Sequence, residues 1–241
     1  PSVFCTACAT GHLDLLVELW HRHRPMLAAF LAGELKDEPD GAFKPLVLAA
    51  MAGRASVVEW LLKTGVSASA LRPGGRDSAL NVASQRGHVD VVRELLQAGA
   101  TGIIDLQQAE TGATPLYFAA EGGFTSVTGL LLEAGANFNK RCHDGESPLF
   151  AAANGGHVEV VELLLKQEGV ELYAQAKKDH GLIKRGDTPF QAACKGCTAR
   201  HMEVADALTA VGGDKAPPRR KSSFELAVEA AGSLYSSFVG S

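Results

Sequence analysis

The sequence predicts an all-α fold, an α-solenoid of about six helix–turn–helix repeats with short β-hairpin or finger loops and a C-terminal amphipathic helix. Three observations support this class. A Ser/Thr–Pro pair, typical of a capped helix start, recurs along the chain. A Gly-His corner recurs in the same register, and leucine-rich helices ending in glycine follow it. One such unit is too small to bury its own apolar faces, so it needs copies on either side.

The most regular copy lies at residues 144–169. Ser147 is placed to cap the free backbone N–H groups of a helix, and Pro148 fits the first helical position, where its missing N–H costs nothing. The glycine pair at 155–156 ends this helix, because glycine readily takes the left-handed conformation. A second, strongly apolar helix is predicted from residue 157 to about residue 166.

The repeat signal has a measurable period. Three copies are Ser/Thr–Pro, and two are variants, Lys44-Pro45 and Ser78-Ala79. The second residues of the five pairs stand at positions 45, 79, 115, 148 and 189, which gives steps of 34, 36, 33 and 41 residues. The Gly-His corner stands at 11–12, 87–88 and 156–157, with Gly53-Arg54 and Gly123-Phe124 as variants. The shared order of a Thr-Pro-Leu start, this corner, and Leu-Leu with a following Gly-Ala resembles the ankyrin repeat. The resemblance covers residues 1 to about 214 and divides this part of the chain into units at 1–24, 40–70, 72–105, 106–140, 141–175 and 186–214.

Two segments are insertions relative to the family pattern. At 25–39, Met26, Leu27, Phe30 and Leu31 have helical spacing, which predicts a longer second helix or an extra turn. The polar, basic connector at 174–185 predicts a loop or an extended finger.

Smaller departures from the pattern mark three other units. The first unit lacks the finger, as fits an end repeat, and the finger of the second carries an aromatic residue, Phe43. In the fourth unit Thr128 and Gly129 interrupt the second helix, so we expect this unit to be the least stable of the inner ones. The last unit has a second helix predicted at 201–210.

Composition is that of a globular chain with no nucleic-acid or membrane signature. The 23 basic and 27 acidic residues give a net charge of −4, which predicts no bulk attraction to nucleic acid. No apolar run reaches the ~18 residues of a membrane span, and no signal peptide opens the chain. The chain begins at Pro1, part-way through a repeat and without methionine, as expected for a trimmed or processed piece of a longer chain.

The cysteines form two Cys-x-x-Cys pairs, Cys5/Cys8 and Cys194/Cys197, a spacing that can indicate zinc. The pairs fall in the first and last units, and stacked helices about 8–10 Å apart would hold them far too distant to share one ion. Cys8 and Cys194 also fall at alanine positions of the repeat, so we interpret them as small buried hydrophobes. A local site of Cys194, Cys197 and His201 lacks a fourth ligand. Unpaired cysteines suit a reducing compartment, in the first place the cytoplasm, with an organelle as the alternative.

No catalytic motif is found, and neither a cofactor nor a metal is expected. The histidines at the corners, His12, His88, His157 and His201, are interpreted as structural. The resemblance to ankyrin repeats implies a non-catalytic scaffold or adaptor that binds a protein through its concave face of fingers and first helices. The candidate contact residues on that face are Phe43, Met51, Arg76, Gln85, Arg86, Glu110, Tyr117, Glu121, His143, Glu146, Phe150, Asn154 and Arg185. The chain is expected to be monomeric alone or a subunit of a hetero-complex.

The segment at 215–241 lies outside the repeat pattern, as a basic linker followed by an amphipathic helix. The helix is predicted from the capping-box spacing of Ser222 and Glu225. Its apolar positions fall three or four apart and include Phe224, Val228, Leu234, Tyr235 and Phe238. Three hypotheses remain: the helix caps the stack, docks into a groove on a partner, or lies on a membrane surface. Ser222 follows three basic residues and is a candidate phosphorylation site.

Two alternatives to the adaptor function remain open. The chain could be an accessory subunit or regulatory module of a larger complex or enzyme whose catalytic part lies elsewhere. The weaker alternative is a metal- or redox-regulated module that uses the Cys-x-x-Cys pairs.

Overall fold

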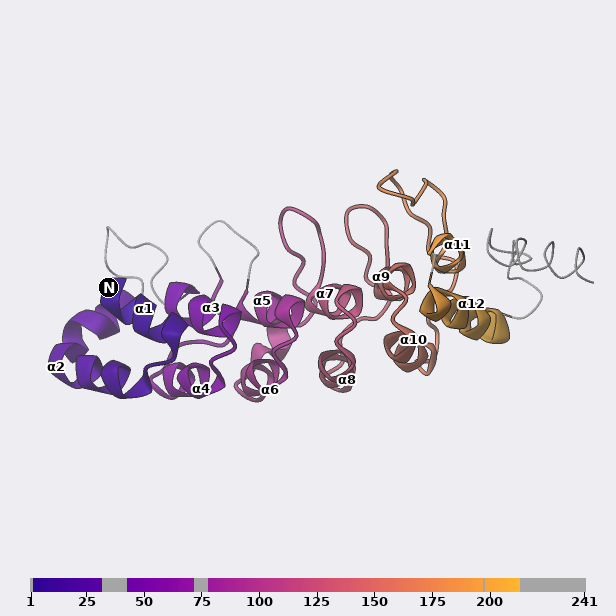
Figure 1. Cartoon of the computed structure of the whole chain (residues 1–241). Helices are drawn as coiled ribbons and strands as arrows, with labels where there is room; N and C mark the ends of the chain where they lie inside the picture. Colours follow the sequence, from indigo (N-terminus) through magenta and orange to yellow (C-terminus); the bar gives the residue numbers. More distant parts are fainter. Residues whose placement is uncertain (1, 32–42, 72–77, 197, 213–241) are drawn as a thin grey trace, which may run out of the picture.

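The computed structural model describes residues 2–31, 43–71, 78–196 and 198–212. In this part of the chain helices follow one another in antiparallel pairs, which confirms the predicted all-α solenoid (Figure 1). The helices are α1 (Ser2–Thr10), α2 (Leu13–Leu31), α3 (Phe43–Met51), α4 (Ala55–Lys63), α5 (Ala79–Arg86), α6 (Val89–Gln97), the 3-10 turn η1 (Ala100–Ile103), α7 (Pro115–Glu121), α8 (Thr125–Glu133), α9 (Pro148–Gly155), α10 (Val158–Leu165), α11 (Pro189–Lys195) and α12 (Ala199–Gly212).

The helices form two layers. The first helices of the pairs pack against one another in the order α1, α3, α5, α7, α9, α11, and the second helices follow as α4, α6, α8, α10, α12. The finger loops that lead into α7, α9 and α11 project from the side of the first helices, away from the second layer (Figure 1). Within the described residues no strand forms, and only two isolated antiparallel bridges occur, Leu71 with Ser78 and His180 with Ile183.

Four first helices begin as the sequence predicts, with a side-chain oxygen accepting a hydrogen bond from a backbone N–H three residues on. Ser78, Thr114, Ser147 and Thr188 are these caps. Thr188 forms a full capping box, because the side chain of Gln191 also accepts from its backbone N–H at 2.9 Å.

The prediction for Pro45 was wrong in detail. Helix α3 begins at Phe43, so the proline is its third residue and not its first. A missing N–H is tolerated anywhere in the first turn, because these groups have no intrahelical partner. Phe43 consequently belongs to a helix and not to a finger.

In every described pair after the first, a side chain at the corner lies over a glycine of the pair before it. A Cβ on that glycine would come within about 3 Å of the corner side chain, and each of the glycines has a positive φ between 68° and 86°. Only glycine adopts this conformation without strain and leaves this space. The corner residues and their glycines are Arg54 over Gly11, His88 over Gly53, Phe124 over Gly87, His157 over Gly123 and His201 over Gly156.

Four of these corner residues also bond to the end of the preceding first helix. The acceptor is in each case the backbone carbonyl three residues before the preceding corner, so the contact has the period of the fold. The bonds run from Arg54 Nε to Ala9 O (3.5 Å), His88 Nε2 to Met51 O (3.1 Å), His157 Nε2 to Glu121 O (2.9 Å) and His201 Nε2 to Asn154 O (2.9 Å). The structural interpretation of these histidines is confirmed for His88, His157 and His201.

The described part of the insertion at 25–39, residues 25–31, extends α2, as its apolar spacing predicts, and residues 32–39 lie outside the described residues. The helix kinks at His23, whose φ of −127° and ψ of 26° are not helical, two residues before Pro25. Beyond the kink, Leu27, Phe30 and Leu31 are buried. The ring of Phe30 meets that of Phe4 edge to face, with centroids 6.3 Å apart, so the extension is part of the core.

The remaining helices agree with their predictions in outline. Helix α10 spans Val158–Leu165, close to the predicted limits, whereas α12 begins at Ala199 and is longer than predicted. No helix among the described residues is long and apolar enough to cross a membrane. The predicted C-terminal helix with Phe224, Val228, Leu234, Tyr235 and Phe238, the candidate phosphosite Ser222 and the finger residue Arg76 lie outside the described residues.

Candidate functional site

Successive fingers are joined by backbone hydrogen bonds along the side of the first helices. The N–H of His143 donates to the carbonyl of Thr111 at 2.9 Å, and one repeat later the N–H of Lys177 donates to the carbonyl of Asp144 at 2.6 Å. The side chain of His143 lies over Gly112, where a Cβ would be only 2.2 Å from the ring. The three fingers that lead into α7, α9 and α11 are therefore connected to one another through their backbones.

The connector at 174–185 is an extended finger, one of its two predicted forms. Its two arms are held together near its base, where the N–H of Ala176 donates to Asp187 O and that of Gly186 donates to Ala176 O. Near the tip, His180 and Ile183 exchange backbone hydrogen bonds of 3.1 and 2.9 Å. The carboxylate of Asp179 accepts from the backbone N–H of Arg185 at 2.7 Å, which lowers the pKa of Asp179.

This extended finger covers part of the surface that was expected to be open. Ile183 is buried in a small cluster with Phe150, Ala176 and Ala192. Phe150 is fully buried, so the prediction that it belongs to the exposed contact surface was wrong. The family pattern places this first-helix position near the fingers, but here the inserted finger carries an apolar residue down onto it.

Tyr117 and Glu146 were also predicted to be exposed contact residues, but both are buried. The hydroxyl of Tyr117 donates to Oε2 of Glu146 at 2.7 Å, and Oε1 of the same carboxylate lies 3.2 Å from Nε2 of His180. Tyr117 is 8% exposed and Glu146 4%. They were predicted as contacts because both belong to the finger side, but they bond to each other between the units and leave little surface.

Burial controls the protonation of this cluster. Desolvation raises the pKa of Glu146, and the Tyr117 hydroxyl and the charge of His180 oppose this effect in part. Desolvation also raises the pKa of Glu121, which His180 lowers in turn. The pKa of Tyr117 is raised as well, by burial first and then by Glu146, so its hydroxyl stays a donor at neutral pH. The network joins Tyr117 on α7 to the extended finger through Glu146 and His180.

Seven of the other candidate contact residues are exposed, and their contact with a partner stays a prediction. Met51 is half-buried against the core. The side chain of Phe43 and the whole of Arg76 are outside the description. The exposed members of the set are Gln85, Arg86, Glu110, Glu121, His143, Asn154 and Arg185.

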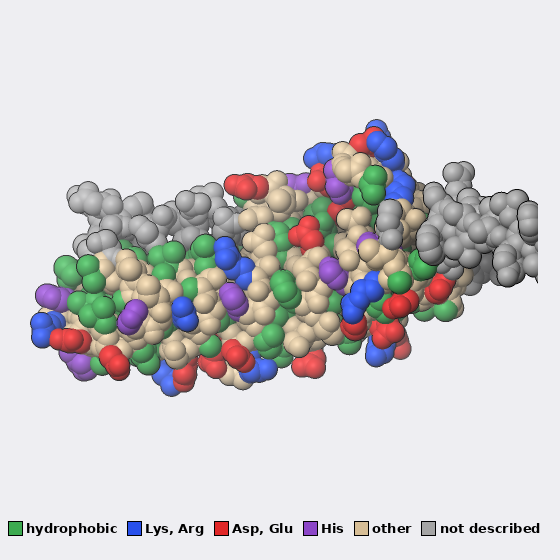
Figure 2. Space-filling model, viewed as in Figure 1, with side chains coloured by type: hydrophobic (Ala, Val, Ile, Leu, Met, Phe, Trp, Pro, Cys, Tyr) green, Lys and Arg blue, Asp and Glu red, His purple; other side chains and the backbone are tan. Residues whose placement is uncertain are grey.

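Of the basic residues on the extended finger, the sequence interpretation named only Arg185 as a candidate contact and missed the three lysines. Lys177, Lys178, Lys184 and Arg185 are exposed, and Figure 2 shows the blue basic side chains gathered at its tip. Lys178 pairs with Asp144 at 2.6 Å and Lys184 with Asp179 at 3.5 Å. The available signal was the apolar pair Leu182-Ile183 inside a polar connector, since an apolar residue there needs a surface to pack on.

The cysteines that the structure describes are buried or half-buried thiols. Burial raises the pKa of Cys8 to about 12, with a further contribution from Cys5, so the thiol is protonated at neutral pH. Burial also raises the pKa of Cys142. Cys197 is outside the described residues, and within them no group of three or more His, Cys, Asp or Glu side chains is arranged to hold a metal ion.

Paired helices in two layers, capped first helices and linked fingers define a helical repeat protein of the solenoid class. Comparison of the sequence with a family model confirms this class. The model of the ankyrin repeats (3 copies) matches residues 4–105, 46–142, 103–176 and 127–218, which together run from residue 4 to residue 218. The chain belongs to the ankyrin-repeat family, whose repeats are commonly protein-binding modules and typically non-catalytic.

Similar proteins share stretches of this repeat region. The Ankyrin repeat and KH domain-containing protein mask-1 of Caenorhabditis elegans is 36% identical over 138 residues, 56% of this chain and 5% of that protein. Ankyrin repeat and KH domain-containing protein CBG24701 of Caenorhabditis briggsae is 33% identical over 144 residues, 58% of this chain and 5% of its own length. Alpha-latrotoxin-Lg1a of Latrodectus geometricus is 26% identical over 135 residues, 56% of this chain and 9% of the toxin. The chain thus spans less than a tenth of each of these relatives.

Proposed function

We propose that this chain is a non-catalytic adaptor that binds a protein partner on its finger side. The observation that carries the proposal is the linked row of fingers, which holds exposed polar and charged side chains on a fixed backbone. A preorganised surface loses little conformational entropy when a partner binds. The exposed contact set runs from Gln85 and Arg86 on α5, past Glu110 and His143, to Asn154 and Arg185.

The extended finger is the part of this surface that we propose selects the partner. Its tip exposes Lys177, Lys178, Lys184 and Arg185, while Asp144 and Asp179 pair with two of the lysines. Charges on an exposed rim raise association rates and exclude wrong partners more than they add affinity. A partner segment with acidic residues therefore fits this end of the surface.

A pull-down with the intact chain, followed by mass spectrometry, tests the proposal. Two charge reversals on the finger side, Arg86→Glu and Arg185→Glu, should weaken capture of the same partners at least about tenfold, an effect of ~1.4 kcal/mol in binding. Lys166→Glu, an exposed residue after the second helix α10, is the matched control and should leave capture unchanged. Equal recovery by all variants would exclude the finger side as the contact surface.

The second candidate is an accessory or regulatory module of a larger protein. It is favoured by the relatives, in which the matched region is only 5% to 9% of the whole length. An immunoblot of cell extract with an antibody against the repeat region distinguishes the two. A single band near the 25.2 kDa of this chain would oppose the module hypothesis.

The C-terminal segment remains a proposal with two forms, a cap on the stack or a second docking element. Deleting residues 217–241 separates them in the same pull-down. If the segment is a cap, its deletion should lower thermal stability and leave the captured partners unchanged. If it is a docking element, its deletion should remove captured partners and leave thermal stability unchanged.

A further inference from the structure

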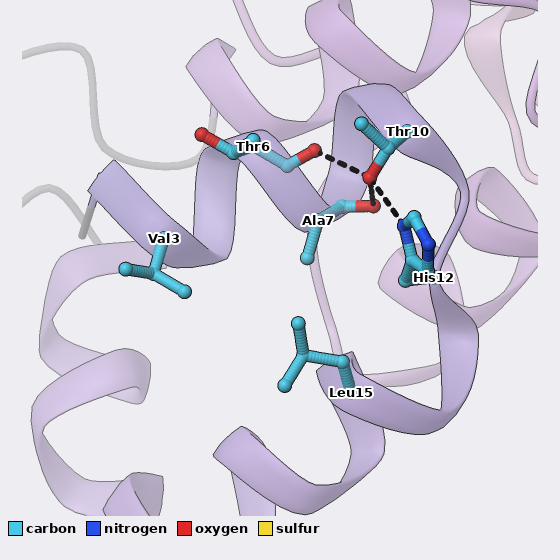
Figure 3. A pocket seen from close by; sticks show the side chains of 6 residues that line it. All are labelled: Val3, Thr6, Ala7, Thr10, His12 and Leu15. Atoms are coloured by element: carbon cyan, nitrogen blue, oxygen red, sulfur yellow. Dashed lines mark hydrogen bonds between the residues drawn. The ribbon is translucent and has the colours of Figure 1, made fainter.

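An open groove lies between α1 and the beginning of α2, at the first helix pair of the stack (Figure 3). Its volume is about 380 Å³, and its lining residues are Val3, Thr6, Ala7, Thr10, His12 and Leu15. Two apolar side chains in it are unusually accessible for this fold, Val3 at 60% and Leu15 at 39%.

The repeat register shows what these positions do elsewhere in the same chain. Leu15 follows its corner residue, His12, by three positions. The residues three positions after the other corners are at most 1% exposed: Val57, Val91, Val127, Val160 and Val204. Val3 precedes His12 by nine positions, and the residues nine positions before the next four corners are buried: Pro45, Ala79, Pro115 and Pro148. Positions that the fold buries everywhere else are therefore open here.

The corner histidine gives a second, independent observation. Nδ1 of His12 lies 2.6 Å from the Thr10 hydroxyl, as Nδ1 of His201 lies 2.7 Å from the Thr198 hydroxyl. The other nitrogen of His201 bonds to a carbonyl of the preceding first helix, Asn154 O, at 2.9 Å. Within the described residues, Nε2 of His12 has no such carbonyl opposite it. Figure 3 shows its ring at the edge of the groove, beside Thr10.

We infer that this groove is the receiving half of an inter-repeat interface and that its occupant is a further ankyrin-type helix pair stacked ahead of α1. The occupant follows from continuity with the interface that the chain itself repeats. A pair in that position brings a corner glycine under the His12 ring, a helix-end carbonyl to Nε2, and apolar cover to Val3 and Leu15.

The chain contains the pieces for a direct test. Ser2 occupies the same register position as Ser147, because Val3 corresponds to Pro148. Residues 114–146, which hold α7, α8 and the finger after them, can therefore be fused directly to Ser2 of the full chain. The graft then presents Gly123 and the carbonyl of Glu121 to His12, as it does to His157 in the native stack.

Hydrogen exchange of the α1 amides measures the result. We expect the graft to slow exchange in residues 2–10 at least about tenfold, because stacking makes local opening less favourable. Leu15→Glu is the matched variant: it should change exchange little in the ungrafted chain, where the side chain reaches solvent, and abolish the protection in the grafted one. A second graft of residues 78–113 presents Gly87 in the same register and repeats the test should the first fail to fold.

Two results would overturn the inference. One is unchanged α1 exchange in both grafted chains while circular dichroism shows the added helices formed. The other is concentration-dependent self-association of the ungrafted chain, seen by sedimentation and removed by Leu15→Glu, since the occupant would then be a second copy.

Discussion

The neighbouring pairs α7/α8 and α9/α10 have the same architecture but unequal packing. In α10 the core positions are Val160, Val161 and Leu164, all fully buried. In α8 the corresponding residues are Val127, Thr128 and Leu131, and the Thr128 hydroxyl is buried without a hydrogen-bond partner in the described structure. Gly129 then follows in mid-helix. A repeat can thus keep its fold while losing several of the contacts that stabilise its neighbour.

The corner of α7/α8 also makes fewer contacts with the preceding pair than the corner of α9/α10 does. His157 places its ring over Gly123 and bonds to Glu121 O at 2.9 Å. Phe124 places its ring over Gly87 but has no donor with which to reach a carbonyl. At its corner the pair α9/α10 is therefore joined to the pair before it by packing and a hydrogen bond, whereas the corner of α7/α8 uses packing alone. Away from the corner, the N–H of Asn137 after α8 still donates to the carboxylate of Asp105 in the preceding unit at 2.9 Å.

The largest expected effect is at Phe150, the buried residue of α9 beneath the extended finger. Phe150→Ala should lower the free energy of unfolding by about 3–5 kcal/mol, because a large buried ring leaves a cavity. It should also speed amide exchange in the finger, whose Ile183 packs in the same cluster. Urea denaturation and hydrogen exchange measure the two effects. Asn154→Ala, at an exposed position, is the control, and a loss below about 1 kcal/mol for Phe150→Ala would contradict the packing.

Gly123→Ala tests the corner between the two pairs. We expect a loss of about 2–3 kcal/mol, from the positive φ of 70° and from displacing the His157 ring, which would lie 2.4 Å from the new Cβ. Gly135→Ala is the matched control, since its φ of 87° is similarly strained but nothing lies within 4 Å of its Cβ position. Equal losses in urea denaturation would show that the ring–glycine contact adds nothing.

Thr128→Val should make α8 more like α10. Removing a buried hydroxyl without a partner and keeping its shape is expected to raise the free energy of unfolding by about 1 kcal/mol. Val92→Thr, the reverse change at the same position of α6, should lower it. A destabilising Thr128→Val would indicate that the hydroxyl has a partner after all.

Gly129→Ala is expected to raise stability further by about 0.5–1 kcal/mol, because alanine has the higher helix propensity. There is room for it, since nothing lies within 4 Å of the Cβ position. Thermal unfolding of the single variant and of Thr128→Val/Gly129→Ala measures the gain. If α8 is the least stable inner helix, hydrogen exchange in these variants should slow more at the α8 amides than at the amides of the other inner helices.

The pH dependence of stability reports on the contact between the two pairs. Glu146 has a raised pKa in the folded chain, so the folded state binds protons more readily than the unfolded state above the ordinary value of 4.5. Stability should consequently rise as the pH falls through the folded pKa toward that value. Glu121, which has its pKa raised by burial too, acts in the same direction.

A difference of one whole bound proton between the folded and unfolded states changes the free energy of unfolding by ~1.4 kcal/mol per pH unit. Glu146→Gln should reduce the slope of stability against pH by a fraction of this amount. Glu110→Gln, at an exposed finger position, is the control and should leave the slope unchanged. Denaturation at several pH values gives both slopes. An unaltered slope in Glu146→Gln would place the responsible group elsewhere.

The features that the sequence could predict are local ones. A cap such as Ser147 and a stop such as Gly156 act within a few residues, so pattern alone placed the starts of four first helices correctly, whereas it misplaced the start of α3. The burial of Phe150 and Glu146 could not be predicted in this way, because it depends on where an inserted finger lies in space. The same holds for the corner histidines, whose acceptors belong to the preceding pair, 36 or more residues away in the chain.

The row of corner contacts has a mechanical consequence. Because each corner side chain bonds to or rests on the pair before it, a stretching force along the stack is passed from pair to pair through these contacts. The corner at Phe124 has a ring–glycine contact and no hydrogen bond from its side chain, so we expect it to be the weakest of the corner contacts. Under load applied at the two ends, the corner contact at Phe124 should therefore open before the other corner contacts, and the bond from Asn137 N–H to the Asp105 carboxylate would then hold the two units together.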